Sequence, residues 1–154
     1  MGEMLRRLIG MAEFEISTAW WRYIGDQKVC RIATSDRTGA PHVKPCWYVV
    51  FEHQILIGTQ KTRKSFRNIV ANNRICLTVD SGTTEAEYKG ITIWGSMEML
   101  PDDEFHTRYR QFLVQRYYGT EDNPGYQYVR SLPAPQLMRV VPDRIHTWDF
   151  GAFA

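Results

Sequence analysis

Apolar and polar residues alternate along several short segments of the chain, a period that is typical of β-strands with one buried face. Three such segments, 29–35, 41–51 and 54–60, follow one another with only a few turn residues between them. Connections of this length join antiparallel strands as hairpins and leave no room for a crossover helix. In 41–51 the odd positions from Val43 to Phe51 share one face and the even positions share the other, so the whole segment is predicted to be one strand.

Three more strands are predicted in the second half of the chain, over 74–80, over 90–100 and over 136–142 with its continuation to 150. The apolar residues at odd positions of 74–80 share one face of the first of these strands. Gly95 interrupts the second strand, and a glycine inside a strand marks a bulge or a close approach of another backbone.

Three segments have apolar residues at the spacing of an α-helix instead of the alternation of a strand. A short helix over 17–25 begins at a capping serine and ends at a glycine, and a longer one begins at Asp102 or Asp103 and ends at Gly119. The stretch 120–135 contains three prolines and is expected to be a loop with little regular structure.

The third predicted helix covers 62–73. Phe66, Ile69 and Val70 supply the i, i+3, i+4 stripe that a packed helix needs. Thr62 is expected to cap the beginning of this helix, and the Asn72-Asn73 pair suits a left-handed ending.

About six short strands with helices between the hairpins indicate a mainly β, α+β fold, an antiparallel split or closed β-barrel. A chain of 154 residues fits one domain over 1–154, with an N-terminal extension over 1–13 and a core over about 14–150.

The amino-acid composition argues against several classes of function. The chain carries 19 Lys and Arg against 17 Asp and Glu, a near balance that argues against a nucleic-acid binder. The N-terminal segment has the pattern neither of a signal peptide nor of a membrane span. Three widely spaced cysteines without a C-x-x-C or H-E-x-x-H motif give a zinc site no support, and their odd number fits the reducing cytoplasm.

The most informative chemistry lies where the strand ending at Thr59 meets the helix that follows. The free N–H groups of a first helical turn and the helix dipole favour an anion at such a junction. Arg63 and Lys64, with Lys61 before them, add positive charge, and Thr59 and Thr62 add hydroxyl donors. The pattern predicts a phosphate site, although a solvated basic turn is the alternative.

Four segments in this order resemble the flavin-binding split-barrel family that includes pyridoxamine 5′-phosphate oxidase. VCRIATSDRTGAPHVKPCWYVVF (29–51) is similar to the opening strands of the family, and ILIGTQKTRKSFRNIVANNRICLTVD (55–80) is similar to its strand-helix-strand segment. KGITIWGSMEML (89–100) and VVPDRIHTWDF (140–150) resemble its last two strands.

The resemblance implies an FMN-binding, homodimeric oxidoreductase with two flavin sites shared at the interface, acting by two-electron transfer on a small molecule. The residues that it assigns to cofactor binding are Thr59, Thr62, Arg63 and Lys64 at the flavin phosphate, Lys44, Pro45, Cys46 and Trp47 beside the ring system, and Trp148, which would reach the flavin of the partner subunit. It names no catalytic residue, and flavin enzymes place the chemistry on the cofactor.

Two departures from the oxidase itself are visible. Gly90 stands where the oxidase offers a polar side chain to the flavin, and the C-terminal R-L-H-D-R run that binds the vitamin phosphate has no counterpart. We therefore do not expect pyridoxamine 5′-phosphate oxidation. A deazaflavin-dependent reductase with a basic groove extended by Arg67 and Arg74 is the nearest alternative.

A non-enzymatic flavin or haem binder is the second alternative, and a haem would need a histidine ligand. His42 is expected at an exposed strand edge and His106 on the solvated face of a helix. His146 lies beside Trp148 in the last predicted strand and could approach the flavin. Cys46 is expected to be a small, buried side chain.

Overall fold

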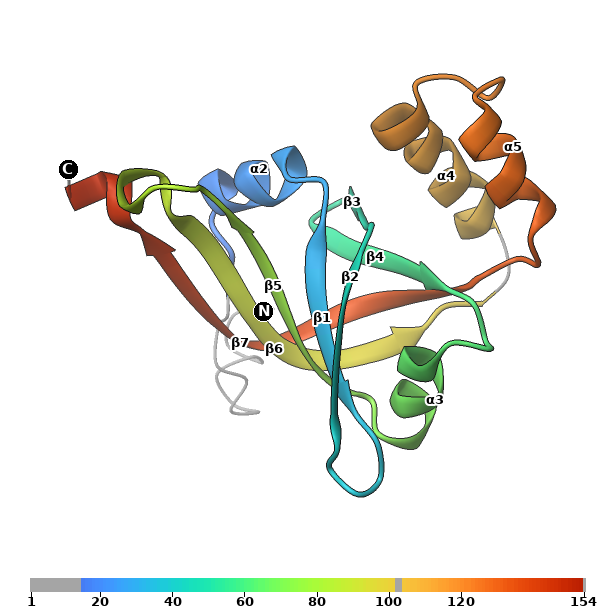
Figure 1. The fold of residues 1–154 in the computed structure, drawn as a ribbon, viewed down its shortest axis with the longest axis horizontal. Coiled ribbons are helices and arrows are strands. Elements are labelled where there is room, and N and C mark those ends of the chain that lie inside the picture. Colours follow the sequence, from blue (N-terminus) through green and yellow to red (C-terminus); the bar gives the residue numbers. More distant parts are fainter. Residues whose placement is uncertain (1–14, 102–103, 154) are drawn as a thin grey trace, which may run out of the picture.

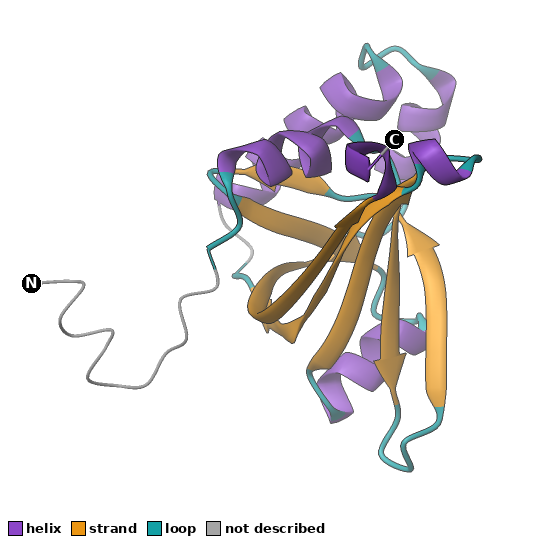
Figure 2. Cartoon of the chain, turned by 90° about the vertical axis from the view of Figure 1, so that its left-hand side faces the viewer, coloured by secondary structure: helices purple, strands orange, loops and turns teal. Residues whose placement is uncertain are grey.

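The computed structural model describes residues 15–101 and 104–153, and within them seven antiparallel strands form one sheet that curls into a half barrel (Figures 1 and 2). The order of the strands in the sheet is β2-β1-β5-β6-β7-β4-β3. The bounds are β1 (Cys30–Ser35), β2 (Pro41–Cys46), β3 (Val49–Phe51), β4 (Gln54–Thr59), β5 (Arg74–Ser81), β6 (Lys89–Met99) and β7 (Gln136–Asp149). The predicted α+β split barrel is confirmed.

The predicted single strand over 41–51 is wrong, because the chain breaks at residues 47–48. β2 pairs with β1 at one edge of the sheet, whereas β3 pairs with β4 at the other. Tyr48 is fully buried at the break and its hydroxyl donates to the carbonyl of Ile24, 2.6 Å away. This contact with a distant helix, which no period along the segment encodes, turns the chain from one edge of the sheet to the other.

Four α-helices flank the sheet in the described part of the chain: α2 (Thr18–Asp26), α3 (Lys64–Ala71), α4 (Glu104–Leu113) and α5 (Pro124–Ser131). A π-helical turn (Val114–Tyr118) extends α4, and Gly119, with φ 78°, ends it as predicted. Two 3-10 helices, Glu85–Glu87 and Phe150–Phe153, complete the elements. Helices α2, α4 and α5 lie toward one end of the half barrel and α3 lies at the other (Figures 1 and 2).

The expectation of an irregular loop over 120–135 is wrong, since α5 occupies its centre. Asn123 caps this helix by accepting a hydrogen bond from the Gly125 N–H at 2.9 Å, and Pro124 takes the first helical position, where its missing N–H costs nothing. The predicted start of the preceding helix, at Asp102 or Asp103, lies outside the described residues.

Both ends of α3 differ from the prediction. Arg63, not Thr62, takes the N-cap position, and its side chain makes no capping bond. Asn72 at the other end has extended backbone, φ −153°, because its side chain makes two bonds of its own. Its amide donates to the Ser35 hydroxyl at 3.0 Å and its carbonyl oxygen accepts from the Arg74 N–H at 3.2 Å, which directs the chain into β5.

Alternate residues of the strands cover the inner face of the curled sheet and form the core. Ile32, Leu77, Ile91 and Ile93 are among them. The register between β6 and β7 shifts at Gly95, as predicted, and a Cβ there would lie 2.1 Å from the carbonyl oxygen of Val141. No helix in the described residues is long and apolar enough to cross a membrane.

Candidate functional site

The junction between β4 and α3 presents hydrogen-bond donors that the described residues do not use. Arg63 has extended backbone (φ −77°, ψ 147°), so the helix begins abruptly at Lys64, and no side chain caps its first N–H groups. The first turn of a helix carries partial positive charge from such groups. The junction is thus open to an anionic acceptor.

Two buried hydroxyl groups flank the same junction. Thr59, the last residue of β4, is 5% exposed, and Ser65, in the first turn of α3, is 2% exposed. Within the described part of the chain, neither Oγ has a hydrogen-bond partner. A buried hydroxyl without a partner costs about 1–3 kcal/mol, and a bound oxyanion would remove that cost. The residues present therefore fit a phosphate group.

Positive charge surrounds this junction and continues along α3. Lys64 and Arg67 line an open groove of about 390 Å³ together with Arg37 and Thr38, which belong to the turn between β1 and β2. Hydrogen bonds from Thr38 and Ala40, helped by the charge of Lys64, hold the pKa of the Asp36 carboxyl below its usual value. The guanidinium of Arg67 also donates to the carbonyl of Thr62 at 2.8 Å and so closes the turn before the helix.

Side-chain hydrogen bonds hold α3 against β1. The amide of Asn68 donates to the hydroxyl of Thr34 at 3.0 Å, and both side chains are buried. This bond lies on the inner face of β1, the face that also carries Ile32 and Cys30. The donors of the α3 N-terminus are consequently held on the side of the sheet where β1 and β2 present their inner residues.

The four predicted ring-binding residues of β2 do not share one face. Lys44 and Cys46 lie opposite Ile32 and Cys30, and are half-buried on the inner face. Pro45 is exposed on the outer face.

Trp47 is the fourth of these residues and follows the end of β2. It is 44% exposed and stacks on Tyr117 with ring centroids 4.4 Å apart. The structure thus brings Lys44 and Cys46 to the face that α3 covers, and directs Pro45 and Trp47 elsewhere.

Trp148 lies at the opposite end of the sheet from α3. It pairs with Gly90, which pairs with Asp80, and Asp80 forms an ion pair with Arg31 near the start of β1. Helix α3 instead contacts the end of β1, through Thr34. One chain therefore does not bring Trp148 to the β4–α3 junction. Its indole Nε1 is buried and has no hydrogen-bond partner among the described residues.

Several residues of this junction were not predicted from the sequence. Ser65 could have been found, because a serine in the first turn beside basic residues is a natural phosphate donor. Arg37 lies in the turn 36–39, which the sequence indicates, but nothing in that turn pointed toward α3. The Asn68–Thr34 bond had no signal at all, since it depends on the packing of a helix onto a strand that is 34 residues away.

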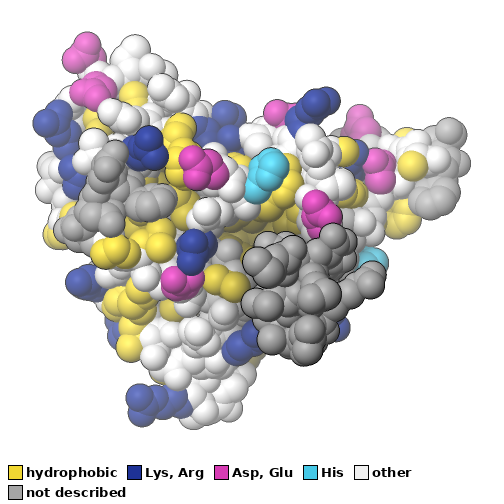
Figure 3. All heavy atoms as spheres, turned by 180° about the vertical axis from the view of Figure 1, so that it is seen from behind, with side chains coloured by type: hydrophobic (Ala, Val, Ile, Leu, Met, Phe, Trp, Pro, Cys, Tyr) yellow, Lys and Arg dark blue, Asp and Glu magenta, His cyan; other side chains and the backbone are white. Residues whose placement is uncertain are grey.

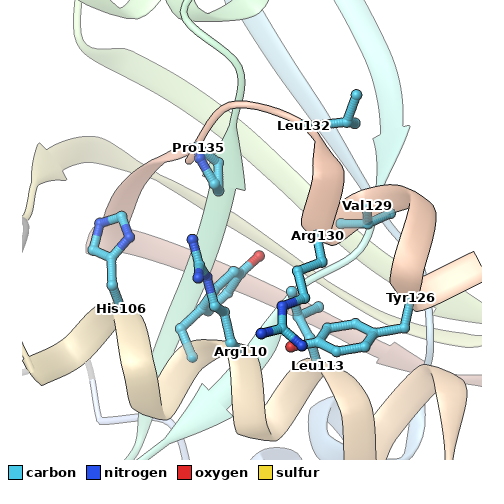
Figure 4. Close-up of a pocket in the computed structure, with 9 residues that line it drawn as sticks. His106, Arg110, Leu113, Tyr126, Val129, Arg130, Leu132 and Pro135 are labelled. Atoms are coloured by element: carbon cyan, nitrogen blue, oxygen red, sulfur yellow. The ribbon is translucent and has the colours of Figure 1, made fainter. Parts of the chain in front are cut away.

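The expectation that His106 is solvated is wrong: its side chain is 8% exposed. It lines a pocket between α4 and α5 together with Arg110, Tyr126 and Arg130 (Figure 4). The far wall of this pocket comes from α5, which the sequence did not predict, and from the segment that follows it to Pro135. The pocket measures about 30 Å³, enough for one or two waters and far too little for a flavin.

The other histidines are more open. His42 is half-buried on the edge strand β2 and His146 is exposed. The ring centroid of His146 lies 5.9 Å from that of Trp148, at an interplanar angle of 28°. Among residues 15–101 and 104–153, no cluster of His, Cys, Asp or Glu is arranged to hold a metal ion.

Comparisons with known proteins agree with the fold described above. The family model described as pyridoxamine 5′-phosphate oxidase matches residues 17–149. A search of curated protein sequences finds no match.

Solved structures share the fold. A conserved hypothetical protein, Rv2991 from Mycobacterium tuberculosis, superposes with a TM-score of 0.77 at 22% identity, over 90% of this chain and 88% of that one. The haem storage protein HutZ from Vibrio cholerae gives 0.68 at 19% identity, over 85% and 93%. An FAD-binding protein from Mesorhizobium loti gives 0.62 at 18% identity, over 86% and 92%. At such identities the likeness shows the fold alone.

Proposed function

The chain belongs to the pyridoxamine 5′-phosphate oxidase family, and from that premise we propose that it is an FMN-binding oxidoreductase acting on a small molecule. The observation that supports this most is the β4–α3 junction. Two buried hydroxyls without partners, an uncapped helix start and two adjacent basic residues are the donors that a phosphate monoester needs.

Each predicted residue then has a defined task. Thr59, Arg63 and Lys64, together with Ser65, would hold the FMN phosphate, and Thr62 lies in the turn between Thr59 and Arg63. FMN, when bound, supplies two-electron redox chemistry.

The ring system would lie beside β2. Lys44 would supply a positive charge next to it and Cys46 a small, polarisable contact. Pro45, on the other side of the strand, and Trp47, after its end, would meet either the ring edge or a second subunit.

The proposed assembly is a homodimer with shared sites, in which Trp148 of each subunit reaches the flavin held by the other. The position of Trp148 at the opposite end of the sheet from α3 supports this arrangement, because one chain does not bring the two together. Large apolar side chains are also exposed, including Val141 and Phe150. Figure 3 shows hydrophobic side chains exposed in several places on the face opposite to that of Figure 1, among charged ones.

A deazaflavin is the alternative cofactor that one observation favours. Its anionic tail would need positive charge beyond the phosphate site, and the groove lined by Arg37, Lys64 and Arg67 provides it. Arg74, the other residue expected to extend this groove, is instead engaged by the carboxylate of Asp143.

The absorption spectrum of the purified protein separates the candidates. Flavin bands support FMN, and a colourless protein that binds deazaflavin supports the alternative. A Soret band would support haem, which HutZ and a neighbour described as a haem-binding protein from Mycobacterium smegmatis make worth testing.

The phosphate anchor is tested by Lys64→Ala. The change should weaken FMN binding by about 1.5–3 kcal/mol, roughly ten- to hundred-fold, because a charge-assisted hydrogen bond is lost. Riboflavin, which lacks the phosphate, should bind almost as before. Both affinities are measured by fluorescence titration.

Arg22→Ala is the matched control, since it removes one exposed positive charge from α2. It should leave FMN binding unchanged. Equal losses for FMN and riboflavin in Lys64→Ala would show that Lys64 does not contact the phosphate.

A further inference from the structure

Two cysteines face each other across the β1–β2 hairpin. Cys30 and Cys46 are directly opposite in the antiparallel register, and their Sγ atoms are 3.3 Å apart. Opposed residues of antiparallel strands have Cα atoms about 4.5–5.5 Å apart, within the range of about 4.4–6.8 Å that a disulfide spans. The backbone is thus already arranged for a bond between these two sulfur atoms.

The two thiols differ in environment. Cys30 is fully buried, whereas Cys46 is only partly buried on the edge strand β2. The hydrogen bond from the Cys30 thiol, helped by the charge of Lys44, lowers the pKa of Cys46, and that same bond together with burial raises the pKa of Cys30. Cys46 is therefore the thiol of the pair that ionises more readily, and Cys30 is the one that keeps its proton more firmly.

We propose that Cys30 and Cys46 form a reversible dithiol–disulfide site whose oxidant is a hydroperoxide such as hydrogen peroxide. In the first step the Cys46 thiolate attacks one peroxide oxygen, the O–O bond breaks, and the released hydroxide takes a proton to become water. In the second step the Cys30 sulfur attacks the Cys46 sulfenic acid, the S–O bond breaks, and the Cys30 proton leaves with the hydroxide as a second water. Two thiols are oxidised to one disulfide and one peroxide is reduced to two waters.

The third cysteine serves as an internal reference. Cys76 lies on β5 opposite Ala33 on one side and Trp94 on the other. Burial raises the pKa of its thiol, so it is the poorer nucleophile. If all three cysteines were ordinary core residues, peroxide would not oxidise Cys30 and Cys46 in preference to Cys76. A redox site predicts that only Cys30 and Cys46 are oxidised to a disulfide.

The bond would close the hairpin at the end away from its turn. Among the described strands, β2 is an edge strand that pairs only with β1. A disulfide between Cys30 and Cys46 would restrain β2 two residues from Lys44. Any effect on flavin binding rests on the proposed function, but the disulfide itself does not.

The test treats the full, reduced chain with hydrogen peroxide, then unfolds it in excess N-ethylmaleimide and counts alkylated thiols by intact mass. The count should fall from three, the number of free cysteines, to one, and dithiothreitol should restore it. Peptide mapping should place the disulfide between Cys30 and Cys46. Cys76→Ser is the matched control and should form the same bond, leaving no thiol to alkylate.

Two further experiments test the order of the two steps and the role of the fold. Cys30→Ser should stop at the sulfenic acid of Cys46, which dimedone traps. The folded wild-type chain should form the bond at least about tenfold faster than the same chain in urea, because folding holds the sulfurs together. Three alkylated thiols in the folded chain, equal rates in urea, or a bond that involves Cys76 or a second chain would overturn the proposal.

Discussion

Gly90 has no side chain, and this leaves room for the indole ring of Trp148, its neighbour across the β6–β7 pair. The indole ring of Trp148 lies directly over it, so that a Cβ at this position would come within 2.2 Å of the Trp148 ring. The glycine therefore replaces the polar residue of the oxidase for a physical reason: the aromatic ring occupies that space. Tyr88 and His146 pack beside the indole ring and restrict its movement.

Gly90→Ala should consequently displace the Trp148 indole and destabilise the fold by about 1–3 kcal/mol, the usual cost of overpacking. Urea unfolding measures the free energy, and near-ultraviolet circular dichroism reports the indole. Gly25→Ala is the matched control, because a Cβ there meets nothing within 4 Å. An unchanged indole signal and unchanged stability in Gly90→Ala would show that the ring moves aside without cost.

At the scale of elements, the position of α3 depends on its bonds to β1 more than on its own sequence. The helix has eight residues, too few to be stable alone. The buried bond from Asn68 to Thr34 and the bond from Asn72 to Ser35 attach it to the strand. A phosphate site at its first turn can be precise only because these bonds hold the helix in place.

Asn68→Ala should cost about 1–3 kcal/mol, because it leaves the Thr34 hydroxyl buried without a partner. The double variant Asn68→Ala, Thr34→Val removes both partners and should cost clearly less than the sum of the two single changes. Urea unfolding of the four proteins gives the coupling energy. Additive costs would mean that the Asn68–Thr34 bond contributes nothing to stability.

At the scale of the molecule, the donors of the β4–α3 junction and the indole of Trp148 lie at opposite ends of one curled sheet. A single chain cannot place both against one flavin. If the flavin contacts both, two chains must contribute to each site, and the interface must bury aromatic and apolar surface as obligate dimers do.

A mixing experiment tests this arrangement. An Arg63→Ala, Lys64→Ala chain is combined with a Trp148→Ala chain under conditions of subunit exchange, and tight FMN sites are counted by titration. With shared sites, half of the dimers are mixed and each of these has one intact site, so about a quarter of all sites should recover. Sites contained within one chain would recover nothing, and a monomer that binds FMN tightly would contradict the proposal as well.

The sequence by itself determined the features that depend on neighbouring residues. Alternation identified β5 and β6, Gly95 marked the bulge, and Ser17 marked the start of α2. The proposed anion site over the segment from Thr59 to Lys64 is likewise a prediction from local order, because a strand end, a helix start and basic residues are all within a few positions.

Only the tertiary structure decided which distant segments meet. The break between β2 and β3 depends on the burial of Tyr48 against α2. The pocket that His106 lines is completed by residues between 126 and 135, which no local pattern places beside it. The pairing of Cys30 with Cys46 depends on the register of the hairpin, in which a shift by one residue would move one of the two cysteines to the other face. Periodicity and capping are properties of a few adjacent residues, whereas burial and register arise from contacts between segments that are far apart in the chain.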